Sequence, residues 1–430
     1  MTATKPPLPS NSFCILPWMH IFADEKGVMY PCCRSVGSQL PNREATGQGR
    51  IYKIQDLDGI EEGWNSAYMR KLRQEMLVGE RPLPCARCYM YEDLGMKSHR
   101  QSQNEQYVEQ IDALVSRTSQ DGRVPLELQS VDIRLGNLCN LRCRMCSPQS
   151  SKALIQEWAD LHGVKATHPY FEELRQLDWF AQPAFWEIFE KYSTKIERLH
   201  FAGGEPLLIA PMFDFLERLI KLDRARNIMI SYNTNLTVLP QRVFELWPHF
   251  RTVRITVSLD GFGDINSFIR YPSHWPTIDQ NLKSLDREVD NLNCTGGLAF
   301  NTTVQIYNIF HLDKFIDYTA DSFINFEAPN LSILSFPEHL SIRILPQEIK
   351  DQLSIKLKTF SQTRVEQWQE KWGKEQAETL AAAIDGIVEH MMSGDSQHLI
   401  PEFLRWCQHQ DQFRKQNVLD VVAELAPLFK

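Results

Sequence analysis

Three cysteines at short, regular steps are the residues of this chain whose spacing most clearly points to chemistry. Cys139, Cys143 and Cys146 stand in the segment GNLCNLRCRMCSPQ, and no fourth cysteine lies close by. Three thiolates on one short loop suit a cubane iron–sulfur cluster in which one iron has no protein ligand. They suit zinc less well, since a structural zinc site has four protein ligands. The other alternative, three unrelated core cysteines, fits poorly with a loop rich in Asn and Arg.

Alternating strands and helices must position this triplet. The six candidate strands span 128–135, 196–203, 227–234, 252–260, 297–305 and 331–336. The stretches between them, such as 211–222 and 275–285, carry apolar residues at three- and four-residue steps, as amphipathic helices do. This alternation predicts parallel β/α units in an open sheet or a barrel. In a barrel the triplet, which follows the first strand directly, would lie at the catalytic face.

The composition limits the class of protein. The 430 residues are 43% apolar and 23% charged, as expected for a globular protein of two or three domains. A formal net charge of −8 offers no basic excess for binding nucleic acid, so we expect no such partner. The opening MTATKPPLPSNSF lacks the apolar core of a secretory signal, and no apolar run approaches the length of about eighteen residues that spans a membrane. Ten partly clustered cysteines in such a chain favour metal ligation or redox chemistry over disulfides, and we expect a cytoplasmic protein.

The chain divides into four expected regions. Residues 1–94 are loop-rich, hold five of the ten cysteines and need a metal to keep their shape. Residues 95–125 form a helical linker, residues 126–346 the β/α domain, and residues 347–430 a helical extension. In the extension we expect helices over PQEIKDQLSIKLKTF, TRVEQWQEKWGKEQAETLAAAIDGIVEHMM, PEFLRWCQHQDQFRK and VLDVVAELAPLF.

The segment CNLRCRMC resembles the CxxxCxxC signature of the radical S-adenosylmethionine (radical SAM) superfamily. The resemblance implies an α/β fold whose centre is a partial (β/α)6 TIM-like barrel. It also implies a catalytic [4Fe-4S] cluster on the three cysteines, whose open iron is completed by the amino and carboxylate groups of SAM. Reductive cleavage of SAM would then produce methionine and a 5′-deoxyadenosyl radical, which takes a hydrogen atom from the substrate.

Further positions match the superfamily in the right order. Gly203-Gly204-Glu205-Pro206 follows the second strand and is similar to the GGEP element that holds the amino group of SAM. Glycines permit close backbone approach, and a carboxylate complements an ammonium, although such a motif by itself can also be a plain turn.

Polar residues at the ends of the next strands complete the candidate pocket. The resemblance implies cofactor contacts from Asn233, with Asn235 beside it, and from Ser258, Asp260 and Arg270. The Arg270 guanidinium is suited to a carboxylate, or equally to a surface ion pair. Three polar residues at period two in the fifth strand are either substrate contacts or internally bonded barrel residues: Asn301, Thr303 and Gln305.

The N-terminal cysteines resemble the first half of the SPASM pattern, known as Twitch. That resemblance implies a second, auxiliary [4Fe-4S] cluster bound by Cys14, Cys32, Cys85 and Cys88. Zinc fits the same four thiols by chemistry alone, and the neighbouring triplet favours the cluster. Unlike the usual Twitch module, this one precedes the barrel. Cys33 exceeds a four-ligand set and is a packing residue, an alternative ligand or a thiol hydrogen donor.

These observations predict a radical SAM enzyme, an oxidoreductase whose other catalytic residues the sequence does not name. SPASM and Twitch enzymes often modify peptides, which implies a peptide or protein substrate and a reaction such as epimerisation, cross-linking or oxidation. It also implies an electron donor such as a flavodoxin or ferredoxin. The alternative is a non-catalytic, zinc-binding adaptor in which both cysteine groups are structural.

Overall fold

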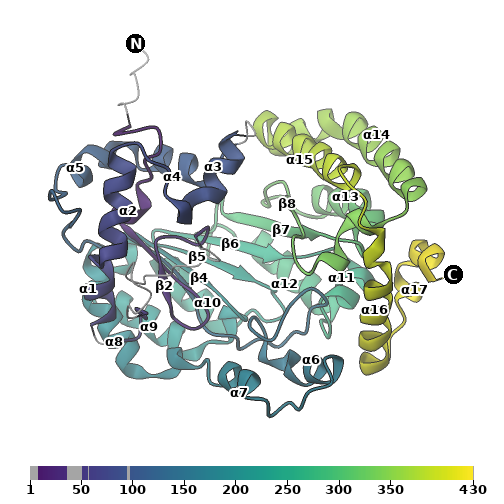
Figure 1. Ribbon diagram of the computed structural model, residues 1–430, viewed down its shortest axis with the longest axis horizontal. Helices are drawn as coiled ribbons and strands as arrows, with labels where there is room; N and C mark the ends of the chain where they lie inside the picture. The colour runs from purple at the N-terminus through teal and green to yellow at the C-terminus, as the bar shows by residue number, and fades with distance from the viewer. Residues whose placement is uncertain (1–7, 36–50, 57, 94–96, 430) are drawn as a thin grey trace. The chain divides into compact units, whose positions relative to one another are not determined.

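The computed structural model describes residues 8–35, 51–56, 58–93 and 97–429 (Figure 1). Residues 1–7, which begin the segment examined for a secretory signal, and the expected boundary at residue 94 lie outside the described residues. Within the described parts of the chain, no helix combines the length and the apolar character that crossing a bilayer requires.

Eight strands form one mixed sheet, in the order β2-β1-β3-β4-β5-β6-β7-β8. Their bounds are β1 His20–Ala23, β2 Met29–Tyr30, β3 Ser130–Arg134, β4 Arg198–Ala202, β5 Met229–Thr234, β6 Thr252–Ser258, β7 Leu298–Val304 and β8 Asn330–Ile333. β1 pairs antiparallel with β2, whereas the pairs β1/β3, β3/β4, β6/β7 and β7/β8 are parallel. The predicted α/β class is therefore confirmed, since β3 to β8 follow one another in the order of an incomplete β/α barrel. β1 and β2 are additions that the sequence analysis did not foresee.

Alternation of buried and partly exposed residues explains why these segments are strands. In β7, Leu298, Phe300, Thr302 and Val304 are buried, and the residues between them are partly exposed. Successive side chains of a strand point to opposite faces, so one face of β7 packs into the core and the other carries polar groups.

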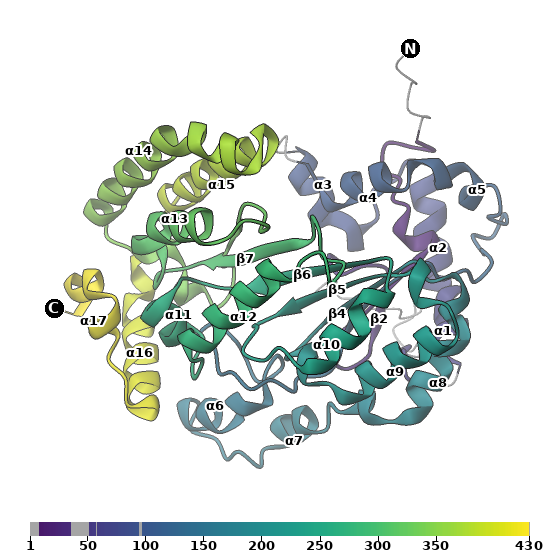
Figure 2. The ribbon, with the colours of Figure 1, turned by 180° about the vertical axis from the view of Figure 1, so that it is seen from behind.

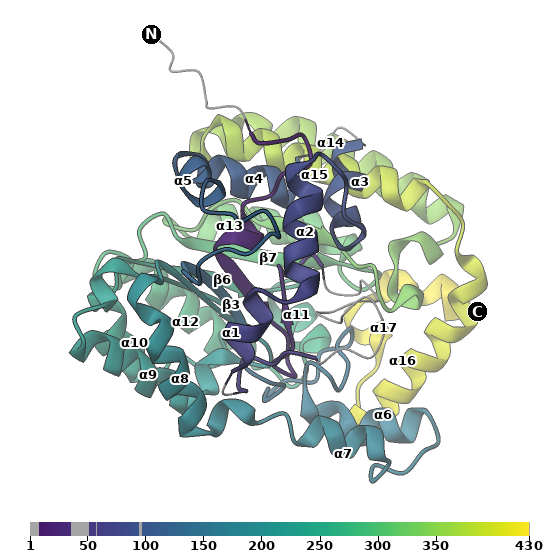
Figure 3. The ribbon, with the colours of Figure 1, turned by 60° about the vertical axis from the view of Figure 1, so that its left-hand side comes forward.

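The first of two compact units comprises residues 1–136, 177–203 and 209–230. Its helices are α1 Gly59–Trp64, α2 Ala67–Leu77, α3 Ala86–Asp93, α4 His99–Gln106, α5 Ile111–Val115, α8 Pro183–Tyr192 and α9 Ala210–Lys221. Figure 3 shows α8 and α9 side by side, where Trp186 of α8 packs on Phe215 of α9 with ring centroids 5.0 Å apart. The N-terminal residues thus share a unit with β3 and β4, since β1 extends the sheet beside β3.

The second unit comprises residues 137–176, 204–208 and 231–430. Its helices are α6 Ile155–Leu161, α7 Pro169–Arg175, α10 Gln241–Leu246, α11 Gly263–Ile269, α12 Trp275–Arg287, α13 Leu312–Ser322, α14 Gln347–Trp372, α15 Lys374–Met392, α16 Ile400–Arg414 and α17 Val418–Val421. The helical C-terminal region is confirmed, and α14 and α15 run side by side (Figure 2). The expected break between the first two C-terminal helices, before TRVEQ, is wrong. The chain remains helical to Trp372 and breaks at Gly373, whose φ of 84° lies in the region that favours glycine.

Candidate functional site

The predicted cysteine triplet lies on the loop between β3 and α6, in the second unit. The amide of Cys146 donates to the carbonyl of Cys143 over 3.1 Å, which turns the chain back on itself. The Cys139 thiol accepts the backbone N–H of Leu141 at 3.4 Å and the side-chain amide of Asn235 at 3.8 Å. The loop therefore has a defined conformation around its thiols.

Two arginines on either side of Cys143 anchor this loop. The amide of Arg142 donates to the Tyr271 carbonyl at 2.5 Å, and that of Arg144 to the Ile269 carbonyl at 2.8 Å. The Arg144 side chain is 0% exposed, lies 3.5 Å above the Phe268 ring and forms an ion pair with Asp411. These contacts place Cys143 against the end of α11, where Arg270 follows.

The three thiols are near one another; Cys143 is buried, whereas Cys139 and Cys146 are partly exposed. Cys143 is 5% exposed, and it shares a side-chain hydrogen bond with Cys146. That hydrogen bond lowers the pKa of Cys143 and, together with burial, raises the pKa of Cys146, while the positive charge of Arg270 favours both thiolates. Burial raises the pKa of Cys139 to about 12. Three such thiols on one loop form a donor set for a cluster with one open metal position.

The two glycines of the GGEP element adopt positive φ, +80° at Gly203 and +45° at Gly204. A Cβ on Gly204 would lie 2.2 Å from the Leu138 carbonyl oxygen, and the next amide, that of Glu205, donates to this same oxygen at 2.8 Å. The close approach that requires glycine at position 204 is thus an approach to the cysteine loop, one residue before Cys139.

The Glu205 carboxylate is 0% exposed and binds protein groups of its own unit. It accepts hydrogen bonds from the Thr234 hydroxyl at 2.7 Å, the Asn235 amide at 2.7 Å and the Leu207 amide at 3.1 Å. Burial raises the pKa of Glu205 to about 7, against the opposing effect of these hydrogen bonds. Because a carboxylate has about four acceptor positions, one remains beyond the three in use.

Asp260 and Arg270 form a buried ion pair, with 2.8 Å between Asp260 Oδ2 and Arg270 Nε. Asp260 is 0% exposed, and its Oδ1 accepts the Thr303 amide at 2.9 Å. Burial raises the pKa of Asp260 and the adjacent guanidinium opposes this rise, whereas Asp260 and the two nearby thiols raise the pKa of Arg270 despite burial. Arg270 is therefore charged, buried and close to Cys143 and Cys146.

The remaining predicted residues occupy more varied positions. Asn233 is exposed on β5, whereas Asn235, just after that strand, contacts the Cys139 thiol. Ser258, at the end of β6, is partly exposed. In the fifth predicted strand, Asn301 accepts a hydrogen bond from Asn330, and Gln305 is 0% exposed.

Some functional candidates escaped the sequence analysis. Thr234 binds Glu205, and its only signal was its place between the two asparagines. In the first unit, Asp132, Arg134 and His200 share one face of β3 and β4, the face opposite the apolar residues Val131 and Ile133. Period-two polar residues within the apolar segments SVDIRL and RLHFAGG were the signal for this face.

The four predicted auxiliary cysteines line one cavity of the first unit, with an empty volume of about 290 Å³. Cys14, Cys32 and Cys88 are 7–9% exposed, and Cys85 is partly exposed. Burial raises the pKa of Cys14 and Cys32 to about 12. The other lining residues are Leu16, Arg34, Ser35, Pro84, His99 and Arg100.

The other three cysteines lie apart from both sets. Cys33 does not line this cavity and interacts instead with Asp132. Cys294 and Cys407 are 0% exposed, and all ten cysteines are free thiols. Among the described residues, no group of three or more His, Cys, Asp or Glu side chains has the geometry of a site for a metal ion.

Comparison with known proteins gives one family match and several similar structures. The family model of the radical SAM superfamily matches residues 133–304. A search of curated proteins finds no match.

Three of the similar solved structures illustrate the range of sequence identity, coverage and TM-score. Native anSMEcpe with bound AdoMet and Cp18Cys peptide has 15% identity and a TM-score of 0.34, over 56% of this chain and 61% of that one. Streptococcus suis SuiB bound to precursor peptide SuiA has 10% identity and a TM-score of 0.35, over 73% and 66%. TYW1 with a lysine-pyruvate adduct bound has 13% identity and a TM-score of 0.27, over 58% and 76%. The chain spans about six tenths of the length of the anSMEcpe chains that it matches.

The family match covers the cysteine loop, the GGEP element and the Asp260–Arg270 pair. Residues 133–304 therefore form a domain of the radical SAM superfamily of enzymes.

Proposed function

We propose that Cys139, Cys143 and Cys146 hold a [4Fe-4S] cluster with one open iron, and that S-adenosylmethionine binds there. The observation that carries this proposal is the gathering of three thiols, one buried and two partly exposed, close to the cation of Arg270 and within the domain that the family model matches. When bound, the cluster supplies an electron that cleaves the cofactor's carbon–sulfur bond, which leads to removal of a hydrogen atom from the substrate.

The chain's own residues orient these groups. Arg270 has five N–H donors, and its ion pair with Asp260 occupies the Nε edge, so the remaining donors suit the carboxylate of the cofactor. Glu205 holds the segment after β5 against the cysteine loop, and its remaining acceptor position suits an ammonium group. Gly203, Asn233, Ser258 and Asp260 remain proposed cofactor contacts.

Cys14, Cys32, Cys85 and Cys88 are the proposed ligands of an auxiliary [4Fe-4S] cluster, because they line a common cavity. From the resemblance of this set to Twitch modules we infer a peptide or protein substrate, modified by epimerisation, cross-linking or oxidation. A flavodoxin or ferredoxin is the proposed electron donor. The free thiols agree with a reducing compartment, for which we propose the cytoplasm.

Metal and product analysis test this proposal. Anaerobically reconstituted protein should hold about eight irons with matching sulfide per chain, and should form 5′-deoxyadenosine from SAM under reduction. Replacing Cys139, Cys143 and Cys146 together by Ala should abolish 5′-deoxyadenosine and leave about four irons. Cys33→Ala is the matched control and should retain both the full iron content and the formation of 5′-deoxyadenosine. Stoichiometric zinc without iron would instead support the adaptor hypothesis and end the enzymatic one.

A further inference from the structure

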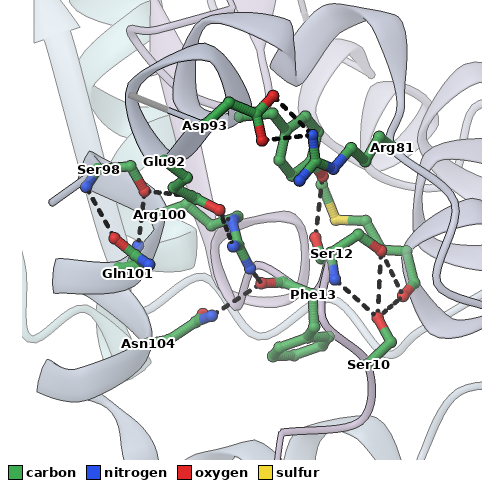
Figure 4. A network of polar contacts seen from close by, with 12 residues as sticks. Ser10, Ser12, Phe13, Arg81, Glu92, Asp93, Ser98, Arg100, Gln101 and Asn104 are labelled. Carbon is green, nitrogen blue, oxygen red and sulfur yellow. Dashed lines mark hydrogen bonds and ion pairs between the residues drawn. The ribbon is translucent and has the colours of Figure 1, made fainter. Parts of the chain in front are cut away.

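The helix α4 holds the chain on both sides of Cys14, and Figure 4 shows its contacts with Phe13, the residue before that cysteine. Arg100 of α4 donates from Nη1 to the Phe13 carbonyl at 2.6 Å, and Asn104 donates to the same carbonyl at 2.8 Å. The Ile15 amide donates in turn to Asn104 Oδ1 at 2.9 Å. The backbone that carries Cys14 is therefore held directly by α4.

Arg100 also lines the four-cysteine cavity and places a buried positive charge at its wall. Its side chain is 4% exposed, and it lines the cavity together with the cysteines. Its guanidinium binds the Glu92 carboxylate in a bidentate manner, with 3.0 Å between Arg100 Nε and Glu92 Oε1. Glu92 is 12% exposed and also accepts a hydrogen bond from the Ser98 hydroxyl at the start of α4.

The cavity wall thus carries a cation and, behind it, an anion, both shielded from water. In such surroundings a charge acts over a longer range than it does at the surface. A tetrathiolate cluster becomes more negative on reduction, so a fixed cation at its wall favours the reduced form and an anion disfavours it.

We propose that Arg100 and Glu92 set the reduction potential of the auxiliary cluster, with Arg100 raising it and Glu92 lowering it. This inference rests on the proposed function, since it takes the cavity to hold a [4Fe-4S] cluster. Arg100 acts as a positioning residue for Cys14 and as an electrostatic neighbour of the cluster, and Glu92 acts through Arg100.

The test is a redox titration, monitored by electron paramagnetic resonance, of the full chain in which Cys139, Cys143 and Cys146 are Ala. In this background Arg100→Gln should lower the potential and Glu92→Gln should raise it. Each change should be at least tenfold in the ratio of reduced to oxidised cluster at a fixed solution potential, or about 59 mV for one electron. Arg100→Lys keeps the charge and should restore most of the wild-type value.

The matched control is Arg81→Gln, on the ion pair with Asp93 that Figure 4 also shows. This pair is 55% and 58% exposed, so water screens it and the potential should not change. Intact clusters with unchanged potentials in both Arg100→Gln and Glu92→Gln would overturn this inference alone. If the Arg100→Gln protein binds no iron at the auxiliary site, the Glu92→Gln protein alone tests the inference. An unchanged or lower reduction potential in Glu92→Gln would then overturn it. Zinc in the unsubstituted N-terminal cavity would overturn the assignment of the cavity and the inference with it.

Discussion

At the scale of single residues, buried charges dominate the candidate site. Glu205 and Asp260 are both 0% exposed, yet their surroundings differ. Asp260 lies against a guanidinium, whereas Glu205 is held by neutral hydrogen-bond donors. The two carboxylates should therefore respond differently to pH and to substitution.

Glu205 should make the stability of the metal-free protein depend on pH. Its pKa rises from an ordinary 4.5 to about 7 on folding, so the folded state binds this proton more tightly than the unfolded state does. The resulting stabilisation is present below pH 4.5 and is lost as the pH rises towards 7, an effect of at most about 3 kcal/mol. Urea unfolding between pH 4.5 and 7 should show that the free energy of unfolding falls more steeply with pH in the wild type than in Glu205→Gln. Parallel pH profiles for the two proteins would contradict the raised pKa.

Removing Arg270 should destabilise the second unit strongly. Arg270→Met leaves the Asp260 carboxylate buried without its cation, at a cost of about 3–5 kcal/mol in the free energy of unfolding. The double variant Asp260→Asn/Arg270→Met should recover part of this loss, because no charge then stays buried. Chemical denaturation of the wild type, Asp260→Asn, Arg270→Met and the double variant measures the coupling between the two residues. Strictly additive effects would mean that the ion pair does not form.

At the scale of elements, the segment after β4 and the loop after β3 meet through backbone atoms. The Leu138 carbonyl oxygen accepts the Glu205 amide and faces Gly204. A side chain at position 204 therefore displaces the cysteine loop itself, and not merely a neighbouring side chain.

Gly204→Ala should separate these two elements. Its added Cβ would meet the Leu138 oxygen at 2.2 Å, so we expect a loss of about 3 kcal/mol in stability and loss of iron from the three-cysteine site. Gly163→Ala is the matched control, because Gly163 also has positive φ, +64°, but no atom lies within 4 Å of the added Cβ. It should show only the backbone cost of about 1–2 kcal/mol, with iron content unchanged. Equal iron content in both variants would refute the proposed contact.

At the scale of the whole molecule, the C-terminal helices help to build the site of the second unit. Figure 3 shows α16 beside α6, and the ion pair between Arg414 and Glu157, at 2.8 Å, joins them. Asp411 of α16 also pairs with Arg144 in the cysteine loop, across more than half of the chain length. The helical extension thus belongs to the same compact unit as the cysteine loop.

Asp411→Asn should weaken the three-cysteine site, although Asp411 is remote from the three cysteines in sequence. The Arg144 charge, 0% exposed, would lose its counter-ion, which costs about 3–5 kcal/mol. We expect fewer irons at the triplet and about four irons retained in the N-terminal cavity, measured by iron analysis with electron paramagnetic resonance. Asp385→Asn, on an exposed position of α15, is the control and should behave as the wild type. Iron loss from both sites at once would point to global unfolding instead.

The sequence by itself predicted the central β/α elements of this protein and the superfamily of its central domain. The alternation of apolar strand segments with helical stretches of 3.6-residue periodicity predicted all six strands from β3 to β8, because these patterns express which face of an element is buried. The CxxxCxxC spacing identified the superfamily, because the three cysteines of that signature lie close together in the chain.

Tertiary structure alone decided which polar groups meet. β1 is four residues long, and its place beside the barrel strands depends on pairing with β3, more than a hundred residues later. The ion pairs of Arg270 with Asp260 and of Arg144 with Asp411, like the contact of Arg100 with the Cys14 segment, join residues that no local pattern relates. Local periodicity reports burial, whereas the partner of a buried charge depends on how distant segments pack.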